Sequence, residues 1–253
     1  CRRVRRRPGG HGTILTVSTL PSSNVPTPRD FTVADFDFAL PPELIAQHPA
    51  AERSASRLLD GSGALPVDRV FRDLPSLLQP GDLLVFNDTR VIKARLHGKK
   101  PTGGSVEALV ERILPGHEVW AHLRASKSPR PGSTVRFAGA FDAQVLGRAG
   151  PEDSLFHLRF PADPLALLDQ HGHVPLPPYI KREDTLCDES RYQTIYAKNE
   201  GSVASPTAGL HFTAEILEAI KGRGVEIAEV TLHVGPGTFL PVRAATLEEH
   251  RMH

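Results

Sequence analysis

A run of short segments with alternating apolar and polar residues constrains this chain most, because such segments fold as strands that must pair with one another. They are expected at residues 105–112, 117–124, 133–137, 141–147 and 155–160. Turn sequences such as LPGH and SPRPG separate them. Several short strands at about ten-residue spacing are typical of a small barrel. We predict a β-barrel over residues 80–162, which also takes in the apolar segment LLVFNDTRVIKARL, expected to form two strands or one bulged strand.

Two helices are expected beyond the barrel. DPLALLDQHG predicts a helix that ends near Gly172. Thr213 is a good N-cap for a second helix, which ends at the glycines of KGRG. The apolar stripe of this second helix is Ile216, Leu217 and Ile220.

Two further elements are expected at the ends of this region. Pro41 and Pro42 precede ELIAQ, and proline in a first turn predicts a short helix there. Residues 228–234 alternate as a strand, with His233 on its polar face, and GPGT follows directly. Strand ends and helix starts in mixed sheets are where ligands bind, so this part of the chain is expected to carry a site.

The first 33 residues differ in composition from the rest. They are rich in Arg, Pro, Gly and Ser without a sustained apolar period, which predicts a disordered or non-native extension. Met252 is the only methionine, and we hypothesise that translation starts downstream of Cys1, at Val17. The chain stops at EEHRMH after a helical pattern, and we hypothesise that the native chain continues.

Composition excludes several classes of protein. No run of eighteen apolar residues is present, so neither a membrane span nor a secretory signal is expected, and we predict a cytoplasmic protein. Cys1 and Cys187 lack the spacing of a disulfide framework or a zinc site. Paired histidines such as His250 and His253 lack a third ligand, so we predict no metal. The net charge of +1 does not argue for nucleic acid, although the middle segment is locally basic.

Seven blocks in order carry a resemblance to a known family. They are DFDFALPPELIAQHP, GDLLVFNDTRVIKARL, TGGSVEAL, HVPLPPYIKR, RYQTIYA, SPTAGLHFT and LHVGPGTFLPVR. From about Asp35 to His253 the chain resembles the S-adenosylmethionine:tRNA ribosyltransferase-isomerases of queuosine biosynthesis. It departs from the family at Ser205 and Pro236, where alanine is usual, and it stops before a family segment with an NFHLPKS-like motif.

The resemblance implies both a fold and a reaction. The fold would be mixed α/β, with a larger discontinuous α/β domain (34–79 and 163–253) that carries the antiparallel barrel (80–162) as an insertion. The reaction would move the ribosyl group of S-adenosylmethionine onto the 7-aminomethyl-7-deazaguanine of the tRNA wobble position, giving epoxyqueuosine, adenine and methionine. S-adenosylmethionine would be consumed, with no other cofactor, and the enzyme would be a monomer. The alternative is a truncated homologue that binds tRNA without turnover. An unrelated α/β hydrolase finds no support, because G-x-S-x-G is missing from the sequence.

Such a reaction needs a base beside the sulfonium, donors for developing oxygen charge and an acid for adenine. The catalytic candidates are His211, His233, Asp88, Thr207 and Thr213. The candidates for binding substrate are Asn87, Arg90, Tyr179, Tyr192, Gln193, Gly209, Gly235, Gly237 and Thr238. The candidates for the tRNA backbone are Lys127, Arg130, Lys181 and Arg182.

Each candidate also has a structural interpretation. A single histidine at a strand end is more often a packed residue, and only the resemblance favours chemistry for His211. NDTR at 87–90 is equally consistent with a hydrogen-bonded turn or bulge. The tyrosines are consistent with ordinary packing, and the cations with a solvated face.

Overall fold

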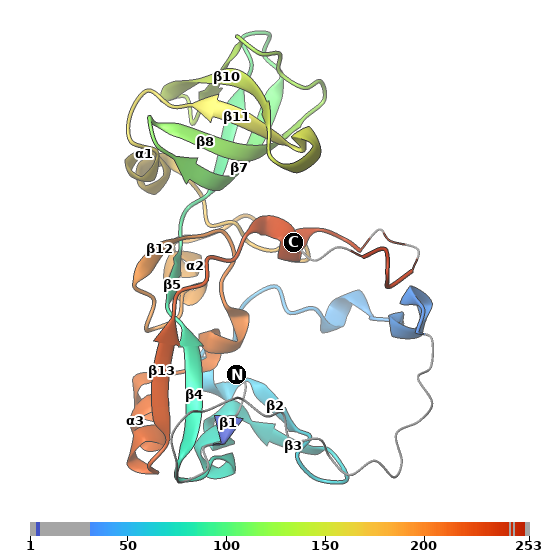
Figure 1. Cartoon of the computed structure of the whole chain (residues 1–253), viewed down its shortest axis with the longest axis vertical. Coiled ribbons are helices and arrows are strands. Elements are labelled where there is room, and N and C mark those ends of the chain that lie inside the picture. Colours follow the sequence, from blue (N-terminus) through green and yellow to red (C-terminus); the bar gives the residue numbers. More distant parts are fainter. Residues whose placement is uncertain (1–3, 6–30, 243, 245, 251–253) are drawn as a thin grey trace, which may run out of the picture.

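The computed structural model describes residues 4–5, 31–242, 244 and 246–250. A barrel lies at one end and a small open sheet at the other, with short helices and loops between them (Figure 1). Of the predicted N-terminal extension, most lies outside the described residues. Val4–Arg5 forms a short strand, β1, against β4 (Asp82–Asn87).

Six antiparallel strands close the barrel in the order β10-β11-β8-β7-β6-β9. They are β6 (Arg95–Lys99), β7 (Ser105–Leu114), β8 (Glu118–Ala125), β9 (Thr134–Phe137), β10 (Phe141–Ala149) and β11 (Leu155–Arg159). Inward-facing residues such as Val106, Ala108 and Val110 are buried, and polar residues alternate with them. The five strands predicted between residues 105 and 160 are confirmed, and so is the mixed α and β fold class.

Gly98 allows the barrel to close. The closing strands β6 and β9 pair only at Gly98 with Phe137 and at Lys99 with Arg136. A Cβ atom at position 98 would lie 2.7 Å from the backbone oxygen of Arg136 and from the Phe137 ring. Only glycine fits this approach without moving the neighbouring strand.

The barrel does not include residues 80–94, so the predicted start of the barrel at residue 80 is wrong. Strand β4 pairs in parallel with β13 (Glu226–Val230), and β5 (Thr89–Val91) pairs in parallel with β12 (Asn199–Ser202). Leu84 and Phe86 of β4 are buried in a second core together with Phe212 and the helix that follows it. A partner more than a hundred residues away therefore decides where β4 belongs.

Helix α3 (Ala214–Gly222) forms as predicted. The side chain of Thr213 accepts a hydrogen bond from the backbone N–H of Ile216 at 3.4 Å, which caps the helix. Ile216 and Ile220 are buried against the second core. The chain leaves the helix through Gly224, whose φ of +77° suits a residue without a side chain.

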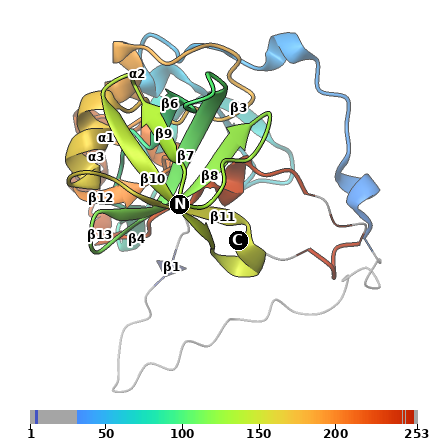
Figure 2. The same ribbon diagram turned by 90° about the horizontal axis from the view of Figure 1, so that it is seen from above.

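Helix α1 (Pro164–His171) also forms as predicted, beside the barrel (Figure 2). The carboxylate of Asp163 accepts from the backbone N–H of Ala166 at 3.0 Å, and Leu168 packs into the barrel core. A third helix, α2 (Leu186–Arg191), follows an extended, proline-rich segment.

Two other predictions fail for local reasons. ELIAQ forms only a single 3-10 turn, η2 (Pro42–Leu44), because so short a segment cannot offset helix nucleation and Leu44 is exposed without a packing surface. The strand predicted over 228–234 ends at Val230, because the Asn87 side chain binds both backbone groups of Leu232.

The remaining elements are short. Strands β2 (Arg57–Asp60) and β3 (Val67–Val70) form an antiparallel pair. The other 3-10 helices are η1 (Val33–Phe36), η3 (Arg53–Ala55), η4 (Phe71–Leu77), η5 (Pro151–Asp153), η6 (Thr207–His211) and η7 (Pro236–Phe239). Among the described residues, the helices are all too short or too polar to cross a membrane.

Candidate functional site

The carboxyl ends of β4 and β13 lie side by side and point toward the barrel (Figure 1). Their last paired residues are Asn87 and Val230. A polar segment follows each strand, NDTR after one and TLH after the other. Crevices outside the carboxyl ends of parallel strands are where α/β folds bind ligands, so this edge is the candidate site.

Asp88 joins the segments that meet at this edge. Its buried carboxylate accepts hydrogen bonds from Thr231 Oγ1 at 2.6 Å and Asn199 Nδ2 at 3.1 Å. Its backbone carbonyl accepts from the N–H of Lys198 at 2.7 Å. The Thr231 hydrogen bond, with help from Asn199, lowers the pKa of Asp88 below its usual value. The carboxylate is therefore held ionised, a state better suited to fixing these loops than to taking up a proton.

Asn87 is also committed to the protein. Its amide nitrogen donates to the Leu232 carbonyl at 2.8 Å. Its amide oxygen accepts from the N–H groups of Leu232 at 3.0 Å and Thr89 at 3.2 Å. Both acceptor sites of that oxygen are occupied, so little of the predicted substrate-binding capacity remains.

His233 is held in place by Thr89, a residue that was not among the predicted site residues. Thr89 is fully buried, and its Oγ1 lies 2.8 Å from His233 Nδ1 and 3.4 Å from the Asn199 carbonyl. When the Thr89 hydroxyl donates to that carbonyl, its oxygen can accept a hydrogen bond from the N–H at Nδ1 of His233. The Nε2 atom of the exposed imidazole then carries no hydrogen and is able to accept a proton. Its position in NDTR, between the predicted site residues Asp88 and Arg90, was the sequence feature that could have identified Thr89 as a site residue.

Gly201 provides the space for this ring. A Cβ atom at Gly201 would lie 2.9 Å from Cε1 and Nε2 of His233, and its φ of +145° is a conformation that favours glycine. The backbone of β12 thus fixes one face of the imidazole while Thr89 fixes its edge.

Three other predicted substrate-binding residues lie in β5 or beside it. The Gln193 amide exchanges two hydrogen bonds with the backbone of Val91, at 3.0 Å and 2.7 Å, and so completes the edge of that strand. Arg90 is half-exposed, with Nε 3.6 Å from Glu200. The phenol of Tyr192 is buried, and burial raises its pKa to about 12.

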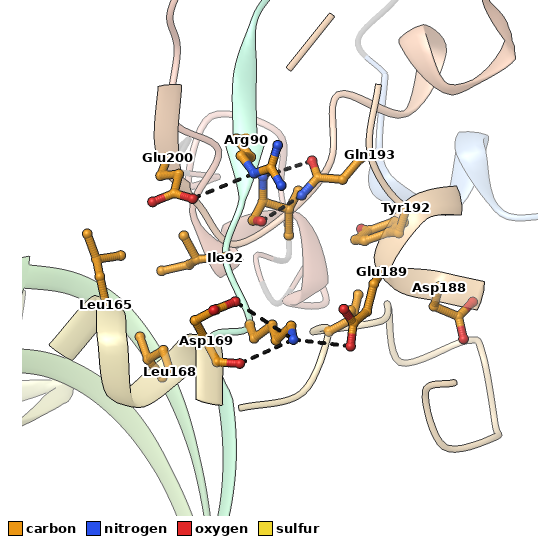
Figure 3. Close-up of a pocket in the computed structure, with 13 residues that line it drawn as sticks. Arg90, Ile92, Leu165, Leu168, Asp169, Asp188, Glu189, Tyr192, Gln193 and Glu200 are labelled. Atoms are coloured by element: carbon orange, nitrogen blue, oxygen red, sulfur yellow. Dashed lines mark hydrogen bonds and ion pairs between the residues drawn. The ribbon is translucent and has the colours of Figure 1, made fainter. Parts of the chain in front are cut away.

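A cavity of about 120 Å³ lies between α1, β5 and α2 (Figure 3). Lys93 stands within it, with Nζ 3.1 Å from Glu189 and 3.8 Å from Asp169, so its charge is matched by two carboxylates. Pockets that enclose drug-sized ligands are roughly 300–1,000 Å³, so this cavity is too small for a whole S-adenosylmethionine.

His211 belongs to a separate group of residues. It ends η6, directly before the first residues of α3, and its half-buried ring lies 5.1 Å from the ring of Phe71. Thr207 begins η6 and is exposed. No contact among the described residues joins His211 to His233, so the structure does not bring these two candidates together.

Gly209 lies against a tyrosine of the protein. A Cβ atom there would lie 2.2 Å from the hydroxyl oxygen of Tyr196 and 2.8 Å from Cγ2 of Thr194. Tyr196 packs in turn on Phe86 of β4. The lack of a side chain at Gly209, a predicted substrate-binding residue, therefore makes room for the protein's own core.

We expect Gly209→Ala to destabilise the chain by roughly 1–3 kcal/mol, the usual cost of overpacking. Much of this loss should be recovered in Gly209→Ala combined with Tyr196→Phe, which removes the oxygen that the new methyl group meets. Chemical denaturation of both variants and of Tyr196→Phe alone measures the coupling. Purely additive effects would show that Tyr196 is not what requires glycine.

Arg182 is the partly exposed member of an ion pair with the buried Asp188. Its Nη1 and Nη2 bind the two carboxylate oxygens of Asp188 at 2.7 and 2.8 Å, and its Nε donates to the Gln47 carbonyl at 2.8 Å. The side chain of Asp188 is 5% exposed, and its hydrogen bonds from Arg182 lower its pKa to about 2. This pairing leaves Arg182 poorly placed for the predicted contact with a tRNA phosphate.

The remaining predicted residues are open to solvent or lie on loops. Lys127, Arg130 and Lys181 are exposed cations, and Tyr179 is 52% exposed. Gly235 precedes η7, which contains Gly237 and the exposed Thr238. Among the residues that the structure describes, no cluster of three or more metal-ligating side chains is found.

The family model described as "Queuosine biosynthesis protein" matches residues 33–253. Three similar relatives carry the name S-adenosylmethionine:tRNA ribosyltransferase-isomerase: the proteins of Aromatoleum aromaticum (61% identical over 224 residues), Azoarcus sp. (58% over 224) and Herminiimonas arsenicoxydans (57% over 223). Each alignment covers 88% of this chain and 64% of the relative, so the chain spans less than two thirds of their length.

A solved structure, that of S-adenosylmethionine tRNA ribosyltransferase from Thermotoga maritima, is 33% identical. The match covers 79% of this chain and 58% of that one, with a TM-score of 0.31. The family model alone accounts for most of the sequence, including every predicted site residue. This chain belongs to the queuosine biosynthesis protein family.

Proposed function

We propose that the chain acts as an S-adenosylmethionine:tRNA ribosyltransferase-isomerase. The observation that carries the proposal is the 57–61% identity to relatives with that name. The reaction would attach the ribosyl group of S-adenosylmethionine to 7-aminomethyl-7-deazaguanine in tRNA and release adenine and methionine. S-adenosylmethionine would be consumed as a substrate, and no other cofactor is proposed.

The polar edge beyond β4 and β13 suits part of this chemistry. His233 presents an exposed imidazole whose Nδ1 is bound by Thr89, so Nε2 is free to accept or return a proton. We propose His233 as an acid–base residue and Thr89 as the residue that positions it. Asp88 acts through the loops that it ties together, and its negative charge favours the sulfonium of the substrate.

The start of α3 suits another part of this chemistry, the stabilisation of negative charge on ribose oxygens. The free N–H groups at a helix N-terminus stabilise negative charge, and His211 precedes the N-cap Thr213 by two residues. Thr213 accepts from Ile216 and its hydroxyl also hydrogen-bonds the Glu215 carboxylate, and Thr207 is exposed two turns earlier. We propose that these groups bind oxygens of the ribose as it opens, and that Gly235, Gly237 and Thr238 form a ligand loop opposite.

Two further proposals concern the domain organisation and the oligomeric state. We propose that the barrel is a separate domain inserted into a discontinuous α/β domain, and that the enzyme is a monomer. A chain that binds tRNA without turnover is the alternative, because a segment equal to about a third of each relative has no counterpart here.

Adenine release tests the proposal. The chain, S-adenosylmethionine and tRNA carrying 7-aminomethyl-7-deazaguanine should give adenine in proportion to the modified tRNA. Neither unmodified tRNA nor S-adenosylmethionine alone should support release. If tRNA binds but no adenine appears, the non-catalytic alternative is correct for this chain.

A further inference from the structure

Charge is distributed unequally over the chain. The barrel, residues 95–159, contains ten Lys and Arg against six Asp and Glu, a formal net charge of +4. Residues 31–94 and 160–253 together contain fourteen Lys and Arg against twenty-two Asp and Glu, a formal net charge of −8. Summed charge steers the approach of a charged partner, so a polyanion is attracted to the barrel and repelled by the rest of these residues.

The barrel also carries a groove on its outer surface. Its volume is about 710 Å³, and it crosses strands β9, β6, β7 and β8. Its lining is basic, with His97, Lys99, Arg124 and Arg136 around a single acid, Glu107. The other lining residues are Gly98, Ser105, Val106, Ala138 and Gly139.

Lys99 and Arg124 form no ion pair among the described residues, although Glu107 stands opposite Arg124 in the β7–β8 pair. Arg136 is paired with Asp142 at 3.1 Å, and Glu107 lies 3.9 Å from Arg95. Lys99 stands directly opposite Arg136 in the β6–β9 pair. Like charges in opposed positions destabilise a sheet, and a bound anion would relieve that repulsion.

The lining contains no Phe, Tyr or Trp, and its one ring, that of His97, packs edge-on against His173 at 5.2 Å between ring centroids. Single bases are recognised largely by stacking on aromatic rings, whereas phosphates are bound by Lys and Arg regardless of sequence. This cationic lining is therefore better suited to the phosphates of a nucleic acid backbone than to stacked bases.

We propose that this groove binds the phosphodiester backbone of the RNA substrate, with Lys99 and Arg124 as its principal contacts. The identity of the polyanion as tRNA rests on the proposed function. Arg182 was predicted to contact the RNA backbone, but its guanidinium is paired with Asp188. We assign the backbone contact to the groove instead.

Charge reversal of both residues tests the inference. Lys99→Glu with Arg124→Glu should weaken binding of the chain to an anticodon stem-loop RNA by about tenfold or more at moderate salt. The slope of log affinity against log salt should fall by roughly 1.4–1.8, because two phosphate contacts are lost. Stem-loops of different sequence should be affected equally, since no base is read.

The matched control is Arg57→Glu with Lys221→Glu. Both residues are exposed, each pairs with one surface carboxylate outside the barrel, and the net charge changes equally. This variant should bind RNA nearly as well as the parent chain. Equal weakening in both variants would mean that only net charge matters, and it would overturn the groove assignment.

Binding and turnover separate this inference from the proposed function. RNA binding that depends on Lys99 and Arg124 without any adenine release would support the groove and contradict the proposed enzyme. Adenine release with unaltered RNA affinity in the groove variant would support the enzyme and overturn the groove. Failure of the parent chain to bind RNA, or groove-dependent binding of heparin alone, would also overturn it. A conservative Lys99→Arg with Arg124→Lys variant should retain most of the RNA affinity.

Discussion

Arg182→Met is expected to lower the free energy of unfolding by roughly 1.5–3 kcal/mol, the usual contribution of hydrogen bonds to a charged group. Asp188 would keep its hydrogen bonds from Thr185 but lose both contacts to the guanidinium. Its 5% exposed side chain cannot be rehydrated without opening the start of α2. Chemical denaturation at neutral pH measures the change.

Lys181→Met is the control for this prediction. Lys181 is adjacent and exposed, and its side chain has no hydrogen bond or ion pair among the described residues. Its replacement should change stability by no more than about 0.5 kcal/mol. A comparable loss in both variants would show that the segment is sensitive to any substitution and that the Arg182–Asp188 pair is not the cause.

The same pair predicts an acid dependence. The pKa of Asp188 falls from an ordinary value of 3.8 to about 2 in the folded chain. Its ionised form therefore stabilises the fold above about pH 4, and this contribution is lost as the pH falls toward 2. The stability difference between the parent chain and Arg182→Met should narrow over that range, and a difference independent of pH would contradict the pairing.

His211→Ala is expected to reduce turnover by roughly a hundredfold or more, because it removes a positioned acid–base or charge-stabilising group. The affinity for tRNA should change little. The reason is position, since His211 stands at the start of α3, where free N–H groups favour developing negative charge. The measurement is adenine release per folded molecule, with the folded fraction determined from thermal unfolding.

His171→Ala is the matched control. His171 also packs on a phenylalanine, with ring centroids 5.8 Å apart against 5.1 Å for His211 and Phe71, and both pairs are tilted by 40°. The two variants therefore lose similar packing, but His171 lies in α1 outside the proposed site. Near-normal turnover of His211→Ala, accompanied by a large loss of stability, would mark His211 as a packing residue.

Local patterns predicted the parts of the fold that depend on local chemistry. Alternation between residues 105 and 160 was sufficient for five barrel strands, because burial of one face requires that period. The cap at Thr213 and the stripe of α3 followed from side chains within one turn of each other. Asp88 and His233 were predicted as site residues, and the segments that carry them do meet.

Pairing between distant segments was decided only in the tertiary structure. The apolar run of β4 suits a barrel strand as well as a parallel strand, and only β13, more than a hundred residues later, places it in the open sheet. The chemistry of polar side chains depends on the same fact. From the sequence, Arg182 is a candidate solvated cation, but in the structure it binds Asp188 and Gln47. Asp88 is likewise a candidate base from the sequence, but in the structure its oxygens accept hydrogen bonds from Thr231 and Asn199.

The sequence by itself thus determined the secondary structure of the barrel, the start of α3 and the family, because periodicity, capping and ordered motifs are properties of neighbouring residues. The tertiary structure decided which polar groups are already satisfied within the protein and which remain available to a substrate. That choice depends on hydrogen bonds and burial between residues far apart in the chain, whose strength is set by distance and exposure and not by sequence order.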